Sequence, residues 1–307
     1  MTNTQSAVAI AAKLTVVITT SLTPSAPSTE LISSVLESYE THCPELLDCN
    51  VIVVFDGYDK VVPKAQLKKG RVTPEQARDF SLYKENVKTL ILEKYYRGEE
   101  VSFSQAGKEA EYGGSFHLYG VPYTITRVHD KRVTFIEPSG RLGFGLAVRS
   151  ALRETETPYV WIQQHDWVLA SDFPTEPVLQ IMEESETKAA PVKYVCLPAI
   201  RMLSYANSMD VQGFPALRTL TLSLKGEYSP DAGPLAGTKV PLTPLFFWHD
   251  KPHIASTAHY LHRVFPSRLA MLRGDFIEDK IGQRARAQMK EGLVSCRSQR
   301  ILSVGMF

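Results

Sequence analysis

Four consecutive polar residues follow an apolar stretch near the middle of the chain. The stretch Tyr159–Ile162 is followed by Gln163, Gln164, His165 and Asp166. Open α/β sheets bind their ligands at the carboxyl ends of their strands, often through polar groups located there. An ionisable aspartate among apolar neighbours also needs a partner, and a metal ion or a cationic ligand is a natural one. These residue types, in this order, predict a ligand site at the end of a strand.

A glycine-containing segment, Arg141–Arg149, precedes that strand. Its sequence, Arg-Leu-Gly-Phe-Gly-Leu-Ala-Val-Arg, predicts a loop that opens a short amphipathic helix. The two arginines at its ends are cations of the kind that neutralise anionic ligands. An anion site beside the polar strand end is therefore one interpretation, and a pair of surface cations is the other.

Three other motif interpretations compete for these residues. Gly143-Phe-Gly145 after a strand has part of the dinucleotide-binding pattern, but Val148 stands at the third glycine. His165–Asp166 has the residue pair of metal-dependent phosphohydrolases, although in those enzymes it lies on helices. Four histidines suggest zinc, but their spacing matches no closed site and no cysteine joins them: His249, His253, His259 and His262.

The elements that must position these residues alternate in type. Leu14–Thr19 is a β-branched run, which predicts a buried strand. Cys49–Phe55 predicts a second buried strand, which ends in Asp56-Gly57. Between them, Leu31–Tyr39 carries apolar residues on one helical face. A strand, a helix and a strand in this order imply a parallel pair with a right-handed crossover. The fold class is therefore expected to be α/β.

The remaining expectations are coarser. After a basic loop, Lys64–Arg71, the chain should form a long helix at about Pro74–Tyr96 and a hairpin of Tyr123–Val128 and Arg132–Ile136. The segment opened by Arg141–Arg149 and its strand should be followed by a helix, Glu176–Glu186, and a strand, Lys193–Pro198. The Gly-, Pro- and Ser-rich stretch Gln212–Thr243 should form loops with one hairpin, and two helices should follow, His253–Phe265 and Asp275 to about Glu291.

Composition excludes several classes. The chain has 307 residues, a formal net charge of +1 and apolar and charged fractions typical of soluble globular proteins. No global field favours nucleic acid or an anionic membrane. Four scattered cysteines without a Cys-x-x-Cys pair suit a reducing compartment, and no apolar run is long enough to span a membrane. A cytoplasmic protein with no nucleic-acid partner is therefore expected.

One resemblance accounts for more of the chain than any single motif. In their order, five segments resemble those of nucleotide-diphospho-sugar glycosyltransferases of the GT-A fold, most closely the inverting family 2: Val16–Ser21, Val53–Gly57, Arg141–Arg149, Gln164–Asp166 and Phe276–Asp279. The resemblance implies a Rossmann-like, mostly parallel sheet flanked by helices, in a single domain of residues 1–307. Residues 14–172 would bind the nucleotide sugar, and the loop-rich residues 173–307 would bind the acceptor.

The resemblance also implies roles for individual residues. A glycan or another hydroxyl acceptor would lose its proton to Asp279, the general base, with Glu278 in support. His165 and Asp166 would hold a divalent cation, Mn²⁺ or Mg²⁺. The donor would contact Thr19, Thr20, Ser21, Asp56, Arg141, Gly143, Arg149 and Gln164, and Asp56 would read the nucleobase.

The chain departs from the family pattern at the metal motif. Gln164 stands where the family has the first acid, so the site carries one negative charge fewer. Cations such as Arg141 or Arg149 are an alternative means of neutralising the diphosphate. Two rival functions share much of this fold, a sugar-nucleotide nucleotidyltransferase and a non-catalytic nucleotide-sugar-binding module. The first usually has a Gly-rich loop with Arg and Lys after the first strand, which Thr20–Ser28 lacks.

Overall fold

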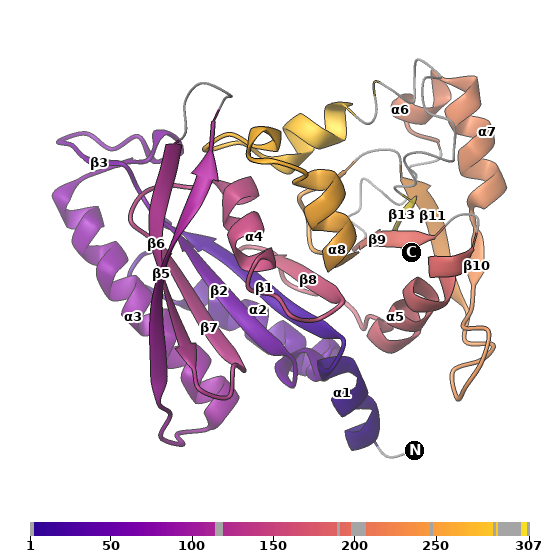
Figure 1. Cartoon of the computed structure of the whole chain (residues 1–307), viewed down its shortest axis with the longest axis horizontal. Helices are drawn as coiled ribbons and strands as arrows, with labels where there is room; N and C mark the ends of the chain where they lie inside the picture. Colours follow the sequence, from indigo (N-terminus) through magenta and orange to yellow (C-terminus); the bar gives the residue numbers. More distant parts are fainter. Residues whose placement is uncertain are drawn as a thin grey trace.

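The structure is a computed structural model of the whole chain (Figure 1). It describes residues 3–113, 119–188, 191–197, 207–245, 248–284, 287 and 302–305. The strands are β1 Leu14–Ser21, β2 Asn50–Asp56, β3 Lys60–Val61, β4 Arg71–Val72, β5 Phe103–Tyr112, β6 Tyr119–Val128, β7 Val133–Pro138, β8 Tyr159–Gln164, β9 Val192–Cys196, β10 Gly226–Tyr228, β11 Val240–Leu245, β12 His253–Ser256 and β13 Leu302–Gly305.

The α-helices are α1 Asn3–Ala11, α2 Glu30–His42, α3 Pro74–Tyr96, α4 Phe144–Leu152, α5 Thr175–Glu184, α6 Met209–Gln212, α7 Pro215–Leu224 and α8 Thr257–His259. Short 3₁₀ turns cover Pro44–Leu47, Leu67–Lys69, Ser185–Thr187 and Arg268–Ala270, and π-helical turns cover Tyr260–Val264 and Glu278–Gly282.

Eleven strands of the described chain form one mixed sheet in the order β10-β11-β13-β9-β12-β8-β1-β2-β7-β6-β5. Its centre, β8-β1-β2-β7, is parallel, as expected for α/β units. Antiparallel pairs flank this centre, with the β5–β6–β7 meander on one side and β12 on the other. The expected α/β architecture and its parallel core are therefore confirmed.

Helices cover both faces of the sheet, and the residues of β1 alternate between the two cores. Leu14, Val16 and Ile18 belong to a hydrophobic cluster with α2, α3 and α5, whereas Val17 belongs to a second cluster with α4. Figure 1 shows α2 and α3 behind the central strands and α4 in front of them. A central strand buried on both faces explains why Leu14–Thr19 has apolar residues on both faces.

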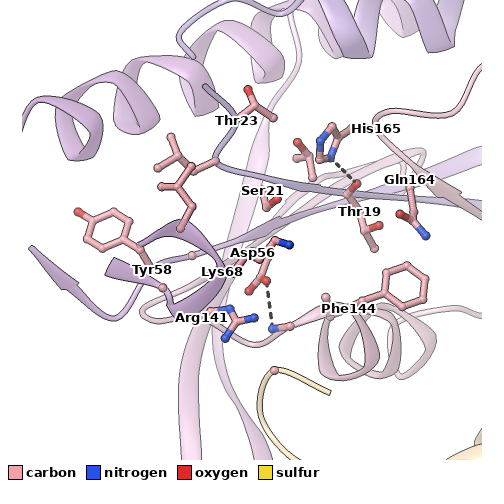
Figure 2. A pocket seen from close by; sticks show the side chains of 18 of the residues that line it. Thr19, Ser21, Thr23, Asp56, Tyr58, Lys68, Arg141, Phe144, Gln164 and His165 are labelled. Carbon is pink, nitrogen blue, oxygen red and sulfur yellow. Dashed lines mark hydrogen bonds between the residues drawn. The ribbon is translucent and has the colours of Figure 1, made fainter. Parts of the chain in front are cut away.

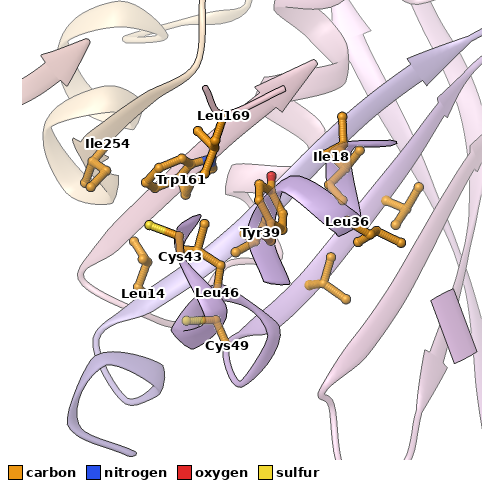
Figure 3. Packing of buried hydrophobic residues seen from close by; sticks show 14 of the residues in the cluster. Leu14, Ile18, Leu36, Tyr39, Cys43, Leu46, Cys49, Trp161, Leu169 and Ile254 are labelled. Atoms are coloured by element: carbon orange, nitrogen blue, oxygen red, sulfur yellow. The ribbon is translucent and has the colours of Figure 1, made fainter. Parts of the chain in front are cut away.

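Figure 3 shows the first of these clusters around Trp161 of β8. The Trp161 ring is fully buried and meets Tyr39 edge-on, with the ring centres 6.3 Å apart. It also meets Phe173 edge-on at 5.3 Å. Edge-to-face pairs of this kind add roughly 0.5–1.5 kcal/mol beyond area burial. Trp161 is thus a packing residue that fixes β8 against α2.

Most of the expected elements are confirmed, although some ends differ: β6 begins at Tyr119, four residues before the expected Tyr123. The long helix is α3, whose N-terminus is a capping box: the Thr73 hydroxyl accepts from Gln76 N at 3.2 Å, and the Gln76 side chain accepts from Thr73 N at 3.0 Å. The hairpin is β6–β7. The start of the last expected helix lies in the π-helical turn Glu278–Gly282, and its far end lies outside the described residues.

Two expectations were wrong in part. The stretch Gln212–Thr243 contains the helix α7 besides its expected hairpin, β10–β11. The segment His253–Phe265 begins as a strand, β12, and turns helical only at Thr257. All four residues of β12 are buried because the strand pairs with β8 on one side and β9 on the other. Sheet pairing of this kind overrides a local helical pattern.

Candidate functional site

A cavity of about 730 Å³ opens at the carboxyl ends of β1, β2 and β8. β1 pairs with β2 on one side and with β8 on the other. The helices α2 and α4, which precede β2 and β8, cover opposite faces of the sheet. The carboxyl ends of β1 and β8 therefore form a topological switch point, the place where open α/β sheets bind ligands. We call this space the large cavity.

Most of the predicted site residues line the large cavity (Figure 2). They are Thr19, Thr20, Ser21, Asp56, Arg141, Gly143, Gln164, His165 and Asp166. These residues come from four segments of the sequence, and strand ends or the loop before α4 bring them together. Arg149 is not among the lining residues. It is 2% exposed, and its guanidinium donates to the backbone carbonyl of Glu111 in β5.

Asp56 holds the loop that precedes α4. Its two carboxylate oxygens accept the backbone amides of Leu142 at 2.6 Å and Gly143 at 3.0 Å. Figure 2 shows one of these bonds, the one to Gly143. Burial raises the pKa of Asp56, while these two amides, Arg141 and Arg273 act in the opposite direction. Both oxygens of the carboxylate predicted to read the nucleobase are thus already engaged by the protein itself.

The same loop is tied to a distant segment, residues 271–276. Gly274 N donates to Leu142 O at 2.7 Å, and Gly145 N donates to the carbonyl of Asp275 at 3.1 Å. Gly143 has φ +80°, and a Cβ there would lie 2.4 Å from Gly274 Cα. Only glycine combines this left-handed conformation with so close an approach of two backbones. The glycine of the predicted motif therefore serves a backbone contact.

The four polar residues at the end of β8, Gln163 to Asp166, have different surroundings and contacts. Gln163 is fully buried, and its side chain accepts from Trp161 Nε1 at 3.1 Å, so it belongs to the core. The Gln164 amide donates to the carbonyl of Asp250. His165 lies against β1, with its backbone N 3.1 Å from the carbonyl of Thr19. Burial lowers the pKa of His165, although the neighbouring carboxylate raises it, and the imidazole is neutral at neutral pH. Asp166 is exposed at the cavity.

A second, smaller cavity of about 280 Å³ adjoins the first, and Gln164 and Phe276 line both. We call it the small cavity. Glu278 and Asp279, the predicted catalytic pair, line it, together with Trp167 and Lys251, whose ammonium lies 4.8 Å from the centre of the Trp167 ring. The structure thus places the predicted acid pair next to the predicted donor site.

A third carboxyl group of the small cavity, Asp250, was not predicted. It is 5% exposed, and its Oδ2 accepts the amide of Glu278 at 3.1 Å, while the Glu278 carboxylate accepts the amide of Asp250 at 3.3 Å. Burial, together with the charges of Glu278 and Asp279, raises the pKa of Asp250 to about 8. The only sequence signal is an acid after the apolar run that ends at Trp248, which resembles the position of Asp56 after β2.

The histidines considered for zinc are separated. His253 is fully buried among aromatic rings, with its ring centre 4.7 Å from that of Tyr194, and burial lowers its pKa to about 3. His259 and His262 line a different cavity. Across the part of the chain that the structure describes, no three His, Cys, Asp or Glu side chains are grouped as metal ligands. None of the helices described there has the length and apolarity needed to cross a bilayer.

Comparisons with known proteins give distant likenesses among solved structures. No protein-family model matches the chain, and no curated protein matches it. Among solved structures, the chain is similar to a mannosyltransferase from Pyrobaculum calidifontis, determined in complex with GDP-Man and Mn²⁺. The identity is 12%, the TM-score is 0.37, and the match covers 82% of this chain but only 46% of the mannosyltransferase. So low a TM-score does not establish a common fold, and the function is therefore argued from the site.

Proposed function

We propose that this protein is a glycosyltransferase of the GT-A type, which moves a sugar from a nucleotide-diphospho-sugar to a hydroxyl acceptor with inversion. The observation that carries the proposal is the pair of joined cavities. One lies at the switch point of the sheet and has cationic residues, and the other is lined by three carboxyl groups. Transfer between two bound substrates requires such adjoining spaces, because the reacting groups must meet at about 3 Å.

The large cavity suits the donor in size and chemistry. Its volume of about 730 Å³ lies within the range of pockets that enclose cofactor-sized ligands. Tyr58 and Phe144 supply apolar walls, Thr19 and Ser21 supply hydroxyl groups, and Arg141 supplies positive charge. A nucleoside diphosphate has a base with an apolar face, ribose hydroxyls and two or more negative charges. The aromatic rings, the hydroxyl groups and the arginine of the cavity could contact these three parts in turn.

The small cavity suits the acceptor and its proton. Inversion by direct displacement needs one base to take the proton of the attacking hydroxyl. Glu278 accepts the backbone amide of Asp250, whereas Asp279 is exposed at the cavity. We therefore assign the base to Asp279 and a positioning role to the Asp250–Glu278 pair. Trp167 offers a ring on which the acceptor can stack.

The test is a thermal-shift and turnover screen with UDP-, GDP- and CDP-sugars. A glycosyltransferase should be stabilised by one nucleotide family, and should release the nucleoside diphosphate when an acceptor is added. Asp279→Asn is the matched variant, which should retain donor stabilisation and lose turnover. Stabilisation without turnover in the wild-type protein would favour a binding module. Release of pyrophosphate from a nucleoside triphosphate and a sugar phosphate would favour a nucleotidyltransferase.

A further inference from the structure

The carboxylates of the large cavity are poorly placed to hold a divalent cation. Mg²⁺ and Mn²⁺ favour several oxygen ligands around one point. Both oxygens of Asp56 accept backbone amides, and the Gln164 amide is directed to the carbonyl of Asp250. Asp166 then remains as the carboxylate on that wall, beside His165. Within the described residues, no three potential ligands of the His, Cys, Asp or Glu type converge. Mg²⁺ in nucleotide sites is usually held by one or two carboxylates together with substrate phosphates and water. The described part of this cavity offers one such carboxylate, Asp166, which is one acid fewer than the GT-A resemblance implies.

Two cations line the same cavity from separate segments. Lys68 lies on the 3₁₀ turn Leu67–Lys69, between β3 and β4, and Arg141 lies in the loop before α4. Figure 2 shows both residues beside Asp56. A third cation nearby, Arg273, pairs with Asp59, so its charge is compensated. Lys68 and Arg141 thus bring positive charge to the wall of this cavity.

Arg141 is held in a cradle of backbone and glycine. Its amide donates to Asp59 Oδ1 at 3.2 Å, and its carbonyl accepts from the Arg273 guanidinium. A Cβ at Gly70 would lie 2.9 Å from Arg141 Cδ, and one at Gly274 would lie 3.0 Å from Arg141 Nη1. Both glycines have positive φ, +64° and +82°. Two chain segments therefore leave room for this side chain, and at Gly70 also for Asp59 Oδ2, which is likewise 2.9 Å from the Cβ position. The close fit fixes the course of Arg141 along the cavity wall.

We propose that Lys68 and Arg141 bind the diphosphate of the donor in place of a divalent cation. The inference rests on the proposed function and specifies how its donor site works. Arginine forms paired hydrogen bonds with phosphate oxygens, and lysine acts as a mobile point charge. In the transfer step, the bond from the anomeric carbon to the diphosphate oxygen breaks as the acceptor oxygen bonds to that carbon. The electron pair stays on the leaving diphosphate, where the two cations stabilise it.

The experiment is calorimetric titration of the full chain with UDP, GDP and CDP, in excess EDTA and in Mn²⁺. The nucleotide that binds should have the same Kd in both conditions, to within about twofold. Lys68→Ala should weaken binding by about tenfold or more, the effect of losing one charge-assisted contact. Lys69→Ala is the matched control, since it removes the adjacent exposed lysine, which does not line the cavity. It should change Kd by less than about twofold.

A second variant tests the arginine without deleting its charge. Gly70→Ala places a methyl group against both Arg141 Cδ and Asp59 Oδ2. It should weaken nucleotide binding by about as much as Arg141→Ala, because it displaces the arginine and the carboxylate that holds the Arg141 amide. Binding that requires Mn²⁺ would overturn the inference and leave the proposed function intact. Equal losses in Lys68→Ala and Lys69→Ala would also overturn it, because diffuse charge would then suffice. If no nucleoside diphosphate binds with or without Mn²⁺, the proposed function fails, and the inference fails with it.

Discussion

Asp56→Asn tests whether this carboxylate organises the site or reads the base. Asparagine keeps the shape but offers one acceptor oxygen in place of two, so either the amide of Leu142 or that of Gly143 loses its partner. A hydrogen bond to a charged group contributes ~1.5–3 kcal/mol, and relief of the buried charge offsets part of that loss. The free energy of unfolding should therefore fall by ~1–2 kcal/mol at neutral pH.

Urea unfolding measures this change, provided that the dependence of the unfolding free energy on urea concentration is the same in the variant and the wild type. Asp48→Asn is the control, because its side chain is 57% exposed and lies 4.0 Å from Arg132, and surface changes of this kind stay within ~0.5 kcal/mol. An unfolding free energy of Asp56→Asn as high as that of the control would refute the argument. Because both oxygens are already engaged, Asp56→Asn should weaken the binding of every nucleoside diphosphate that the wild type binds by one common factor. A loss confined to one base would assign Asp56 to base recognition instead.

Three further predictions follow from the same geometry. The pKa of Asp250 is raised to about 8 by burial, so its contribution to stability is full below its ordinary value near pH 4 and is lost as pH rises through about 8. The unfolding free energy of wild type minus that of Asp250→Asn should fall between these pH values, and a pH-independent difference would contradict this. Gly143→Ala should lower the free energy of unfolding by more than ~2 kcal/mol, because the added Cβ would lie 2.4 Å from backbone. Gly98→Ala, at φ +87° with open space around it, should lower it by only ~1 kcal/mol. Equal losses in the two variants would disprove the close approach at Gly143. Asp279→Asn should lower turnover by ~10²–10⁴-fold and leave donor affinity unchanged. If Asp279→Asn is fully active and Glu278→Gln is inactive, the catalytic base is Glu278 instead.

The sequence predicted those parts of the fold that depend on local pattern. Leu14–Thr19 and Cys49–Phe55 read as buried strands because both of their faces meet a core. The long helix was bounded correctly because Thr73 and Pro74 give a strong start signal. By contrast, β12 forms only because β8 and β9 pair with it from both sides, and a four-residue segment carries no trace of those partners.

The candidate site was predictable in its strand ends and less so in its loops. Asp56 and Gln164 follow apolar runs, so their place at one edge of a parallel sheet could be inferred. Lys68 belongs to a basic loop whose residues look alike in sequence, and only the turn between β3 and β4 directs this one into the cavity. Arg149 was predicted to bind the donor because it lies near the motif in sequence. Its angular position on α4 instead directs its side chain to β5.

The loop of residues 271–276 also bears on how the protein is made. Its contact between Arg273 and Asp59 spans 214 residues, and the one between Arg273 and Arg141 spans 132. Synthesis proceeds at roughly 5–20 residues per second, so the first strand ends leave the ribosome on the order of ten seconds or more before this loop. A nascent chain that ends before residue 271 lacks the backbone that shapes Arg141 and Gly143. The nucleotide site proposed above would therefore take its shape only after residue 276 has been synthesised, which would make ligand binding a checkpoint on that part of the chain.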